Sequence, residues 1–320
     1  MAQPWRLPAK LRSGAGKYES QPFSLSPVVV TDEFLVKVLR ILSVASKIRN
    51  MQPTEDAGSN GQQRPDTVSA LERGIAVLRC FTETRRTLTS TELSRLTGVP
   101  RPTVTRLAST LVTLGLMKQE PEGDRYMLGP GVVSLARVFL AGLDVRAIAR
   151  PHMQALAEAA GGSVYLAVPD GLDMVLIEAC RPRTTMLAPR LDVGSRAPMA
   201  NSALGRAYLW ALPAEERERM IVSLRLARGS DWAGREPSLR HSLAEADRLG
   251  YSISAGEFHR EINSVSVPLV GPSGEIMALN CGTAAFVFTE DHLRQVVAPQ
   301  LLKMAEALAA DLGGHVPQPR

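Results

Sequence analysis

Three short runs with an apolar residue at every third or fourth position follow one another early in the chain. This period is typical of amphipathic helices that bury one face. In the first run Leu71, Ile75 and Leu78 share a face, and Ser69 stands three residues before Glu72. That serine-to-glutamate spacing predicts a capping box, so we expect a helix that begins at Ser69 and buries this apolar face.

Two further helices are predicted, separated by a tight turn. Thr89 and Glu92 repeat the capping-box spacing, and Gly98 suits the left-handed residue that ends many helices. The third helix is expected between Pro100 and Gly115, because a proline in the first turn lacks only an N–H that has no helical partner there. The apolar stripes of these two helices are Leu93, Leu96, Val104, Leu107, Leu111 and Leu114.

A hairpin is predicted after the third helix. Residues 116–120 and 125–128 flank the turn-forming sequence Pro-Glu-Gly-Asp at 121–124. Three short helices followed by a hairpin is the element order of a winged helix-turn-helix, in which the third helix and the wing meet DNA. We therefore predict a winged helix-turn-helix DNA-binding domain over residues 67–128.

The polar face of the third helix supplies candidate DNA contacts. Arginine binds guanine edges or phosphates, and threonine and serine do either more weakly. The candidates on the helix and at the base of the wing are Arg101, Thr103, Thr105, Arg106, Ser109, Lys118 and Arg125. Residues 67–128 carry nine basic and six acidic side chains, a net charge of +3, with three of the acids at the wing tip. An ordinary solvated helix face is the alternative reading of this helix taken alone.

Beyond the wing, the pattern predicts a linker helix and a second domain. Gly-Pro-Gly precedes a strongly apolar helix at 132–140, within a linker that we place at 129–142. Such a helix needs a partner, which is either its own second domain or the same helix of a second subunit. Long helical runs alternate with strand pairs over residues 143–320, which favours an α+β fold. Helices are expected over 145–159, 200–212, 213–226, 238–249 and 290–312, and strands over 164–168, 174–179, 251–254, 264–270 and 275–281.

These segments resemble the IclR family of bacterial transcriptional regulators. The resemblance rests on SALERGIAVL, LTSTELSRLTGVPRPTVTRL and RYMLGP, and then on ARPHMQALAEAAGGSVYLAV, VGSRAPMANSALGRAYLWALP and LGYSISAGEFHREINSVSVPLVGPSGEIMALNCGT. It covers residues 67–314 and implies a GAF-like effector-binding domain at 143–320. Pro102 stands where the family has a small polar capping residue, and Arg206 replaces a common lysine.

The resemblance implies a ligand-responsive, DNA-binding regulator of catabolic genes. Its partners are then double-stranded DNA with a near-palindromic operator, a small organic effector, and further copies of the chain in a homodimer or dimer of dimers. ALNCG together with INSVSVPL points to regulators of aromatic-acid breakdown. The implied effector pocket consists of small hydroxyls and a thiol among apolar walls, namely Met186, Leu187, Ala203, Leu204, Ser254, Ile262, Ser264, Cys281 and Thr283. Each position could instead be plain core or loop.

Composition agrees with this organisation. A length of 320 residues suits two domains, and 45% hydrophobic residues suits a core in each. The three cysteines have no metal-ligand spacing, and the sequence shows neither a signal-peptide pattern nor an apolar run of membrane length. We expect a cytoplasmic protein with no cofactor and no membrane association.

The first 66 residues stand apart from this organisation. Residues 1–27 are rich in proline, serine and glycine, residues 28–48 could form a basic amphipathic helix, and residues 49–67 are polar again. We expect residues 1–66 to be a disordered extension. Residues 1–50 carry eight basic and three acidic side chains, which equals the net charge of +5 of the whole chain, so the charge excess lies outside the DNA-binding domain. One hypothesis is that natural translation starts at Met51. The other is a basic arm that touches phosphate or a membrane surface.

An enzyme or a redox sensor that uses Cys281 is the alternative function. A nucleophilic cysteine needs a positioned base, and the five histidines form no motif with Cys281. The sequence also has no GxSxG, HExxH, P-loop or dinucleotide-binding motif. We therefore predict that the chain is not an enzyme.

Overall fold

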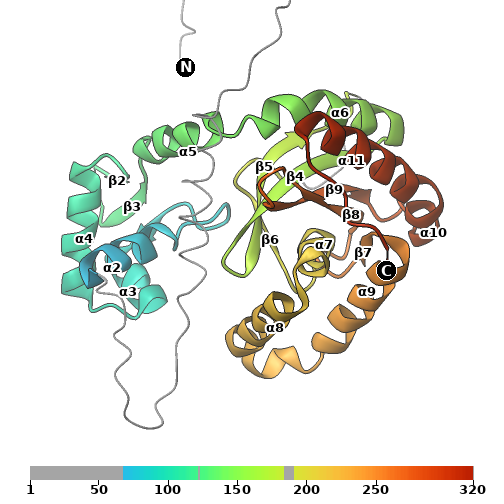
Figure 1. The fold of residues 1–320 in the computed structure, drawn as a ribbon. Helices are drawn as coiled ribbons and strands as arrows, with labels where there is room; N and C mark the ends of the chain where they lie inside the picture. The colour runs from blue at the N-terminus through green and yellow to red at the C-terminus, as the bar shows by residue number, and fades with distance from the viewer. Residues whose placement is uncertain (1–67, 122, 184–190, 320) are drawn as a thin grey trace, which may run out of the picture.

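The computed structural model describes residues 68–121, 123–183 and 191–319 (Figure 1). The predictions for the extension at 1–66, for Met186 and for Leu187 fall outside these residues. Figure 1 shows an N-terminal region, residues 68–128, joined through one helix to a C-terminal region that begins near residue 143.

The N-terminal region has the element order of a winged helix-turn-helix. Its elements are α2 (Ser69–Leu78), β1 (Leu88–Thr89), α3 (Ser90–Thr97), α4 (Arg101–Thr113), β2 (Met117–Gln119) and β3 (Arg125–Leu128). The strands form a small antiparallel sheet in the order β1-β3-β2. β2 and β3 make the predicted hairpin, whereas β1 was not predicted because two residues are too few for a periodic pattern.

Local turn signals in this region are confirmed in two places and wrong in one. The hydroxyl of Thr89 accepts the backbone N–H of Glu92, whose carboxylate accepts the backbone N–H of Thr89 in return. Gly98 ends α3 in the left-handed conformation with φ 69°. The capping box at Ser69 does not form, because Ser69 is already inside α2 and Val68 takes the capping position without a side-chain hydrogen bond to described residues.

The core of the N-terminal region lies between its three helices and the small sheet. The side chains buried there include Val77, Leu93, Val104, Ala108, Leu111 and Met117. The apolar face that we predicted for α2 is partly wrong, because α2 turns Gly74 and Val77 inward. Leu71 is 66% and Ile75 41% exposed, and Leu114 at the end of α4 is also exposed.

α5 (Gly131–Ala141) joins the two regions and buries no side chain against the described chain. Its large apolar residues Val133, Leu135, Val138 and Phe139 are between 43% and 74% exposed. Leu140 near its end packs against the core of the C-terminal region. One chain therefore leaves most of an apolar helix uncovered.

The C-terminal region is an antiparallel sheet with helices on both faces, an α+β fold of GAF-like type (Figure 1). The strands lie in the order β6-β5-β4-β9-β8-β7 and are β4 (Ser163–Asp170), β5 (Asp173–Cys180), β6 (Arg196–Pro198), β7 (Ser252–Ala255), β8 (Ile262–Val270) and β9 (Ile276–Ala284). The helices are α6 (Val145–Ala160), α7 (Ala203–Ala211), α8 (Ala214–Arg228), α9 (Glu236–Leu249), α10 (Glu290–His292) and α11 (Ala298–Leu312). A 3-10 turn at Gly229–Trp232 and a π-helical turn at Leu293–Val297 complete it, the latter dividing the single closing helix that we expected.

A separate hydrophobic core lies on each face of this sheet. Side chains along a strand alternate between the faces, so Leu279 and Cys281 of β9 join the core beneath α6 and α11, and Ala278 joins the core beneath α7 and α9. The α7 side packs closely, because a Cβ on Gly205 would lie 2.1 Å from the Cα of Met199. Among the helices of the described ranges, none has the length and hydropathy needed to cross a membrane.

Candidate functional site

The first half of α4 presents a polar face to solvent. Val104, Ala108 and Leu111 hold the opposite face in the core. Thr103 is half-buried, and the other four predicted contacts are exposed: Arg101, Thr105, Arg106 and Ser109. Pro102 is accommodated in the first turn, where no helical acceptor awaits its missing N–H. The helix is thus fixed on one side and open on the other.

Some of the polar side chains on this face of α4 form hydrogen bonds within the N-terminal region. The hydroxyl of Thr105 donates to the carbonyl oxygen of Arg101 at 3.0 Å. The Nε of Arg101 donates to Ser90 Oγ at 3.3 Å, which ties the start of α4 to the start of α3. Within the described chain, the Arg106 side chain has no hydrogen bond or ion pair. The Nη groups of both arginines are therefore available to acceptors outside the chain.

The wing carries two basic side chains in different surroundings. Lys118 on β2 is exposed. Arg125 on β3 turns toward the edge strand, where its Nε donates to Thr87 Oγ1 at 3.2 Å and its Nη2 lies 4.0 Å from Glu92 Oε2. Hydrogen bonds from Thr89 hold the pKa of the Glu92 carboxyl below its ordinary value, so Glu92 is charged beside Arg125. Lys118 is the freer of the two cations.

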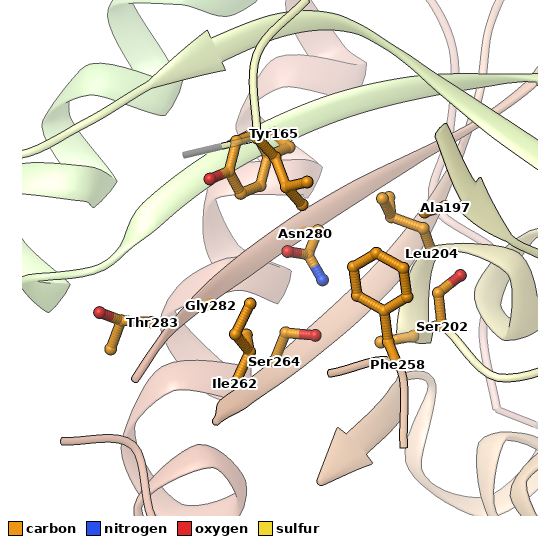
Figure 2. A pocket seen from close by; sticks show the side chains of 12 residues that line it. Tyr165, Ala197, Ser202, Leu204, Phe258, Ile262, Ser264, Asn280, Gly282 and Thr283 are labelled. Carbon is orange, nitrogen blue, oxygen red and sulfur yellow. The ribbon is translucent and has the colours of Figure 1, made fainter. Parts of the chain in front are cut away.

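A cavity of about 30 Å³ lies on the α7 side of the sheet (Figure 2). Its lining residues are Tyr165, Leu191, Ala197, Ser202, Ala203, Leu204, Phe258, Ile262, Ser264, Asn280, Gly282 and Thr283. In Figure 2 the Asn280 amide lies between the rings of Tyr165 and Phe258. Gly282 keeps this space open, because a Cβ there would lie 2.6 Å from the Cβ of Ser264.

The structure brings five of the predicted pocket residues to this cavity, namely Ala203, Leu204, Ile262, Ser264 and Thr283. The helix α7 begins at Ala203, with Ser202 as its cap: the Ser202 hydroxyl accepts the N–H of Gly205 at 3.1 Å. The backbone N–H groups of Ala203 and Leu204 belong to the first turn, where a helix supplies no acceptor.

Two of the predicted pocket residues, Ser254 and Cys281, do not line this cavity. Cys281 is fully buried in the core beneath α6 and α11, because the pleat of β9 turns it away from its neighbours Asn280 and Gly282. Ser254 is also buried, and its hydroxyl donates to the carbonyl oxygen of Asn201 at 3.1 Å instead of facing the cavity.

Sequence reasoning missed the aromatic walls of the cavity and its amide. The alternation along β9 carried a usable signal, since Asn280 and Gly282 are a polar residue and a glycine on the face opposite Cys281. Tyr165 occupies the corresponding face of β4. Phe258 gave no periodic signal, because it lies in the irregular segment between β7 and β8.

The cavity is mainly apolar, with a few polar groups and no charged side chain among the described residues. None of its described lining residues is a lysine, arginine, histidine, aspartate or glutamate. Burial raises the pKa of the Tyr165 hydroxyl, which therefore stays protonated. Asn280 donates to the carbonyl oxygen of Val265 and to Ser266 Oγ, which leaves its own oxygen as an acceptor. Hydroxyls and the N–H groups of α7 can bind a carboxylate or carbonyl oxygen. The described ranges contain no cluster of three His, Cys, Asp or Glu residues suited to a metal ion.

Comparison with known proteins agrees with the geometry of both regions. The IclR helix-turn-helix family model matches residues 70–121, and the model of the bacterial transcriptional regulator IclR C-terminal domain matches residues 138–310. The HTH-type transcriptional regulator TsaQ1/TsaQ2 of Comamonas testosteroni is 35% identical over 204 residues, 63% of this chain and 73% of that protein. The Pca regulon regulatory protein of Pseudomonas putida is 28% identical over 252 residues, 78% of this chain and 86% of that protein.

A solved structure extends the likeness to three dimensions. The crystal structure of an IclR family transcriptional regulator from Brucella abortus superposes with a TM-score of 0.71 and 36% identity, covering 77% of this chain and 93% of that one. The two family models together match the three helices of the N-terminal region and most of the C-terminal region. The chain therefore belongs to the IclR family of bacterial transcriptional regulators.

Proposed function

We propose that this protein is a ligand-responsive regulator of catabolic genes that acts in the cytoplasm on a near-palindromic operator. In this proposal α4 enters the major groove, and the base of the wing, at Lys118 and Arg125, touches the DNA backbone or the minor groove. A small organic acid in the cavity biases the relative placement of two N-terminal regions. Effector and DNA are then coupled because each prefers one arrangement.

The observation that carries the DNA-binding proposal is the exposed cationic face at the start of α4. Arg101 and Arg106 offer free Nη groups on a helix whose other face is anchored in a core. A bidentate arginine on guanine contributes about 1–3 kcal/mol of discrimination between bases. An arginine on phosphate contributes affinity but no sequence preference.

The lining of the cavity supports a small acid with a flat apolar body as the effector. Tyr165 and Phe258 supply aromatic walls, and the first turn of α7 supplies unpaired N–H groups for a carboxylate. Ser264 adds a hydroxyl that can bind a second oxygen. An aromatic carboxylate has this combination of features.

We also propose that α5 pairs with α5 of a second copy. Its exposed apolar residues have no cover in one chain, and burying apolar surface stabilises an assembly by about 25 cal/mol per Å². A two-fold axis there would present two α4 helices to two half-sites about 34 Å apart, in a dimer or in each half of a dimer of dimers.

The position of Cys281 disfavours the alternative of an enzyme or a redox sensor. Its thiol has no exposed surface, and burial raises its pKa to about 12. The thiolate is the reactive form of cysteine, so this thiol is a poor nucleophile at neutral pH. If oxidant nevertheless alters DNA binding, Cys281→Ser tests whether this residue is responsible.

Fluorescence anisotropy tests the main proposal. The full chain is titrated with DNA from upstream of its own gene and with a random duplex, at two salt concentrations. A preference for the upstream DNA that survives the higher salt supports a sequence-reading regulator, and benzoate can then be added as a first effector probe. Absence of binding to either duplex contradicts the DNA-binding proposal, whereas equal, salt-sensitive binding contradicts this choice of operator.

A further inference from the structure

The cavity is too small, as the structure has it, for an organic acid. Pockets that bind small organic ligands have volumes of about 300–1,000 Å³, whereas this cavity has about 30 Å³, so one wall must move before such a ligand can enter. The sheet wall is backed by a second core, and α7 buries every residue from Ala203 to Trp210. Neither the sheet nor α7 can move far, because either movement would disrupt the packing of a hydrophobic core.

Two of the described segments that form walls of the cavity are exposed to solvent on the side away from it. One is the stretch before α7, where the backbone of Leu176 on β5 bonds to Ser195 at 3.0 Å and to Gly194 at 2.8 Å. The other is the segment 256–261 between β7 and β8, which we call the cover segment. The cover segment carries Phe258, whose ring lines the cavity (Figure 2). Apart from a backbone hydrogen bond in which the N–H of Ala285 donates to the carbonyl oxygen of Glu261 at 2.8 Å, its attachments to the region beyond its immediate sequence neighbours involve side chains.

A charged clasp holds the cover segment against α7 and α9. Arg206 of α7 is 2% exposed, and its two Nη atoms donate to the two carboxylate oxygens of Glu257, one of them at 2.7 Å. Arg206 also donates to the carbonyl oxygen of Ile253 and to Ser238 Oγ, both at 3.1 Å. Ser238 in turn donates to Glu257 at 2.9 Å. The two Nη groups of this buried arginine are therefore bound by the cover segment and its neighbours.

The backbone of the cover segment is tied into the same network. The side-chain amide of Asn201 donates to the carbonyl oxygen of Glu257 at 3.0 Å. Ser254 donates to the carbonyl oxygen of Asn201 and accepts the N–H of Phe258 at 3.4 Å. Glu257 and its partners thus determine where Phe258 lies relative to the start of α7.

We propose that Arg206 and Glu257 are positioning residues of the effector cavity: their ion pair latches the cover segment, and Phe258 moves aside with that segment to admit a ligand. This inference rests on the proposed function, because it takes the cavity as the effector site. It assigns a role to Arg206 and Ser254, neither of which touches the cavity. It also identifies Glu257 and Phe258 as residues that set ligand entry.

Access to the cavity can be measured without knowledge of the effector. In the full chain, Ser264→Cys places a thiol on the cavity face of β8, where a small methanethiosulfonate reagent reaches it only when the cavity opens. The three natural cysteines are buried. Cys281 lies on the other face of the same sheet, so labelling of Cys281 reports unfolding rather than opening.

In the Ser264→Cys background we expect Glu257→Gln and Arg206→Lys to raise the labelling rate of the introduced thiol at least about tenfold, with Cys281 still protected. The reason is that a charge-assisted, forked contact is worth about that factor or more in an equilibrium, and lysine cannot supply the fork. Phe258→Ala should raise the rate with the clasp intact. Glu218→Gln is the matched control, since it removes an exposed carboxylate paired with Arg240 away from the cavity, and it should leave the rate unchanged.

An unchanged rate in both clasp variants, with Cys281 protected, would overturn the proposal. A parallel rise at Cys281 would overturn it as well, because the clasp would then support the fold rather than the cover. Operator binding is measured on the same variants by anisotropy. Absence of DNA binding by the unsubstituted chain contradicts the proposed function, whereas the labelling rates test the clasp independently of DNA and effector.

Discussion

Arginines of the two regions have different surroundings. In the C-terminal region a carboxylate lies within 4 Å of many of them, among them Arg146, Arg181, Arg196, Arg206, Arg225, Arg240 and Arg294. In the described part of residues 68–128 we find one such contact, between Arg125 and Glu92 at 4.0 Å. An arginine with a carboxylate of its own serves the fold, whereas one without it can bind phosphate or guanine. The same residue type therefore predicts stability effects in one region and binding effects in the other.

The largest loss of stability is expected from a substitution of Glu178 on β5. Its carboxylate is buried and lies 3.1 Å from Arg146 and 3.2 Å from Arg150, both on α6. Glu178→Ala leaves the partly buried Arg146 without its carboxylate partner, so we expect the free energy of unfolding of the C-terminal region to fall by about 3 kcal/mol. Urea unfolding followed by circular dichroism measures this in both regions, and tryptophan fluorescence assigns the change to the C-terminal region, because Trp210 and Trp232 are buried there.

Arg101→Ala is the control for that measurement. The Arg101 side chain is exposed and makes one hydrogen bond to Ser90, so its loss should change the free energy of unfolding by no more than about 0.5 kcal/mol. If Glu178→Ala and Arg101→Ala lowered the free energy of unfolding equally, the proposed difference between the arginines of the two regions would be contradicted.

The next largest effect is expected on DNA binding. Arg106→Ala should weaken operator binding by about 1–3 kcal/mol and leave the fold unchanged. Anisotropy with single-base operator variants separates two causes: a lost guanine contact relaxes one operator position, and a lost phosphate contact weakens all duplexes alike. Arg294→Ala removes an arginine that pairs with Glu245 and Glu290 and should not change operator affinity. A loss of affinity in Arg294→Ala as large as that in Arg106→Ala would contradict the comparison.

The N-terminal region was predictable where the signal is local. The caps at Thr89 and Gly98 depend on neighbours three or four residues away, and both were found as predicted. The inward face of α2 depends on the helix that packs against it, and α2 carries apolar residues on more than one side. Periodicity selected Leu71 and Ile75, while packing selected Gly74 and Val77.

The cavity was less predictable, because its residues come from distant parts of the chain. A shift of one residue along β9 exchanges Cys281 for Asn280 and Gly282, and hydrophobic patterning does not fix that choice when both faces of a strand are buried. The contact between Arg206 and Glu257 joins residues 51 positions apart. This contact forms because the fold places the cover segment beside α7, and no local sequence pattern predicts it.

A smaller effect distinguishes the two cations of the wing. Lys118→Ala should lower the slope of log K against log salt by about 1, as expected for one lost phosphate contact. Arg125→Ala should lower the slope less, because Arg125 is already engaged by Thr87 and Glu92. Anisotropy at four salt concentrations gives both slopes. A larger change for Arg125→Ala would show that Arg125 leaves its intramolecular partners when DNA binds.

The smallest effect is expected at an exposed arginine cluster of the C-terminal region. Hydrogen bonds from Arg225, and next from Arg240, lower the pKa of the Glu236 carboxyl to about 2. A carboxyl with a lowered pKa in the folded state stabilises the fold above its ordinary pKa of 4.5, and that contribution is lost as the pH falls toward 2. Both arginines are about half exposed, so solvent screens the cluster, and Glu236→Gln should cost less than about 1 kcal/mol at pH 7. Thermal unfolding at pH 7 and pH 3 should show this difference shrinking with acid. A cost at pH 7 that matches Glu178→Ala would mean that carboxylate pairing, rather than burial of the pair, decides which arginines support the fold.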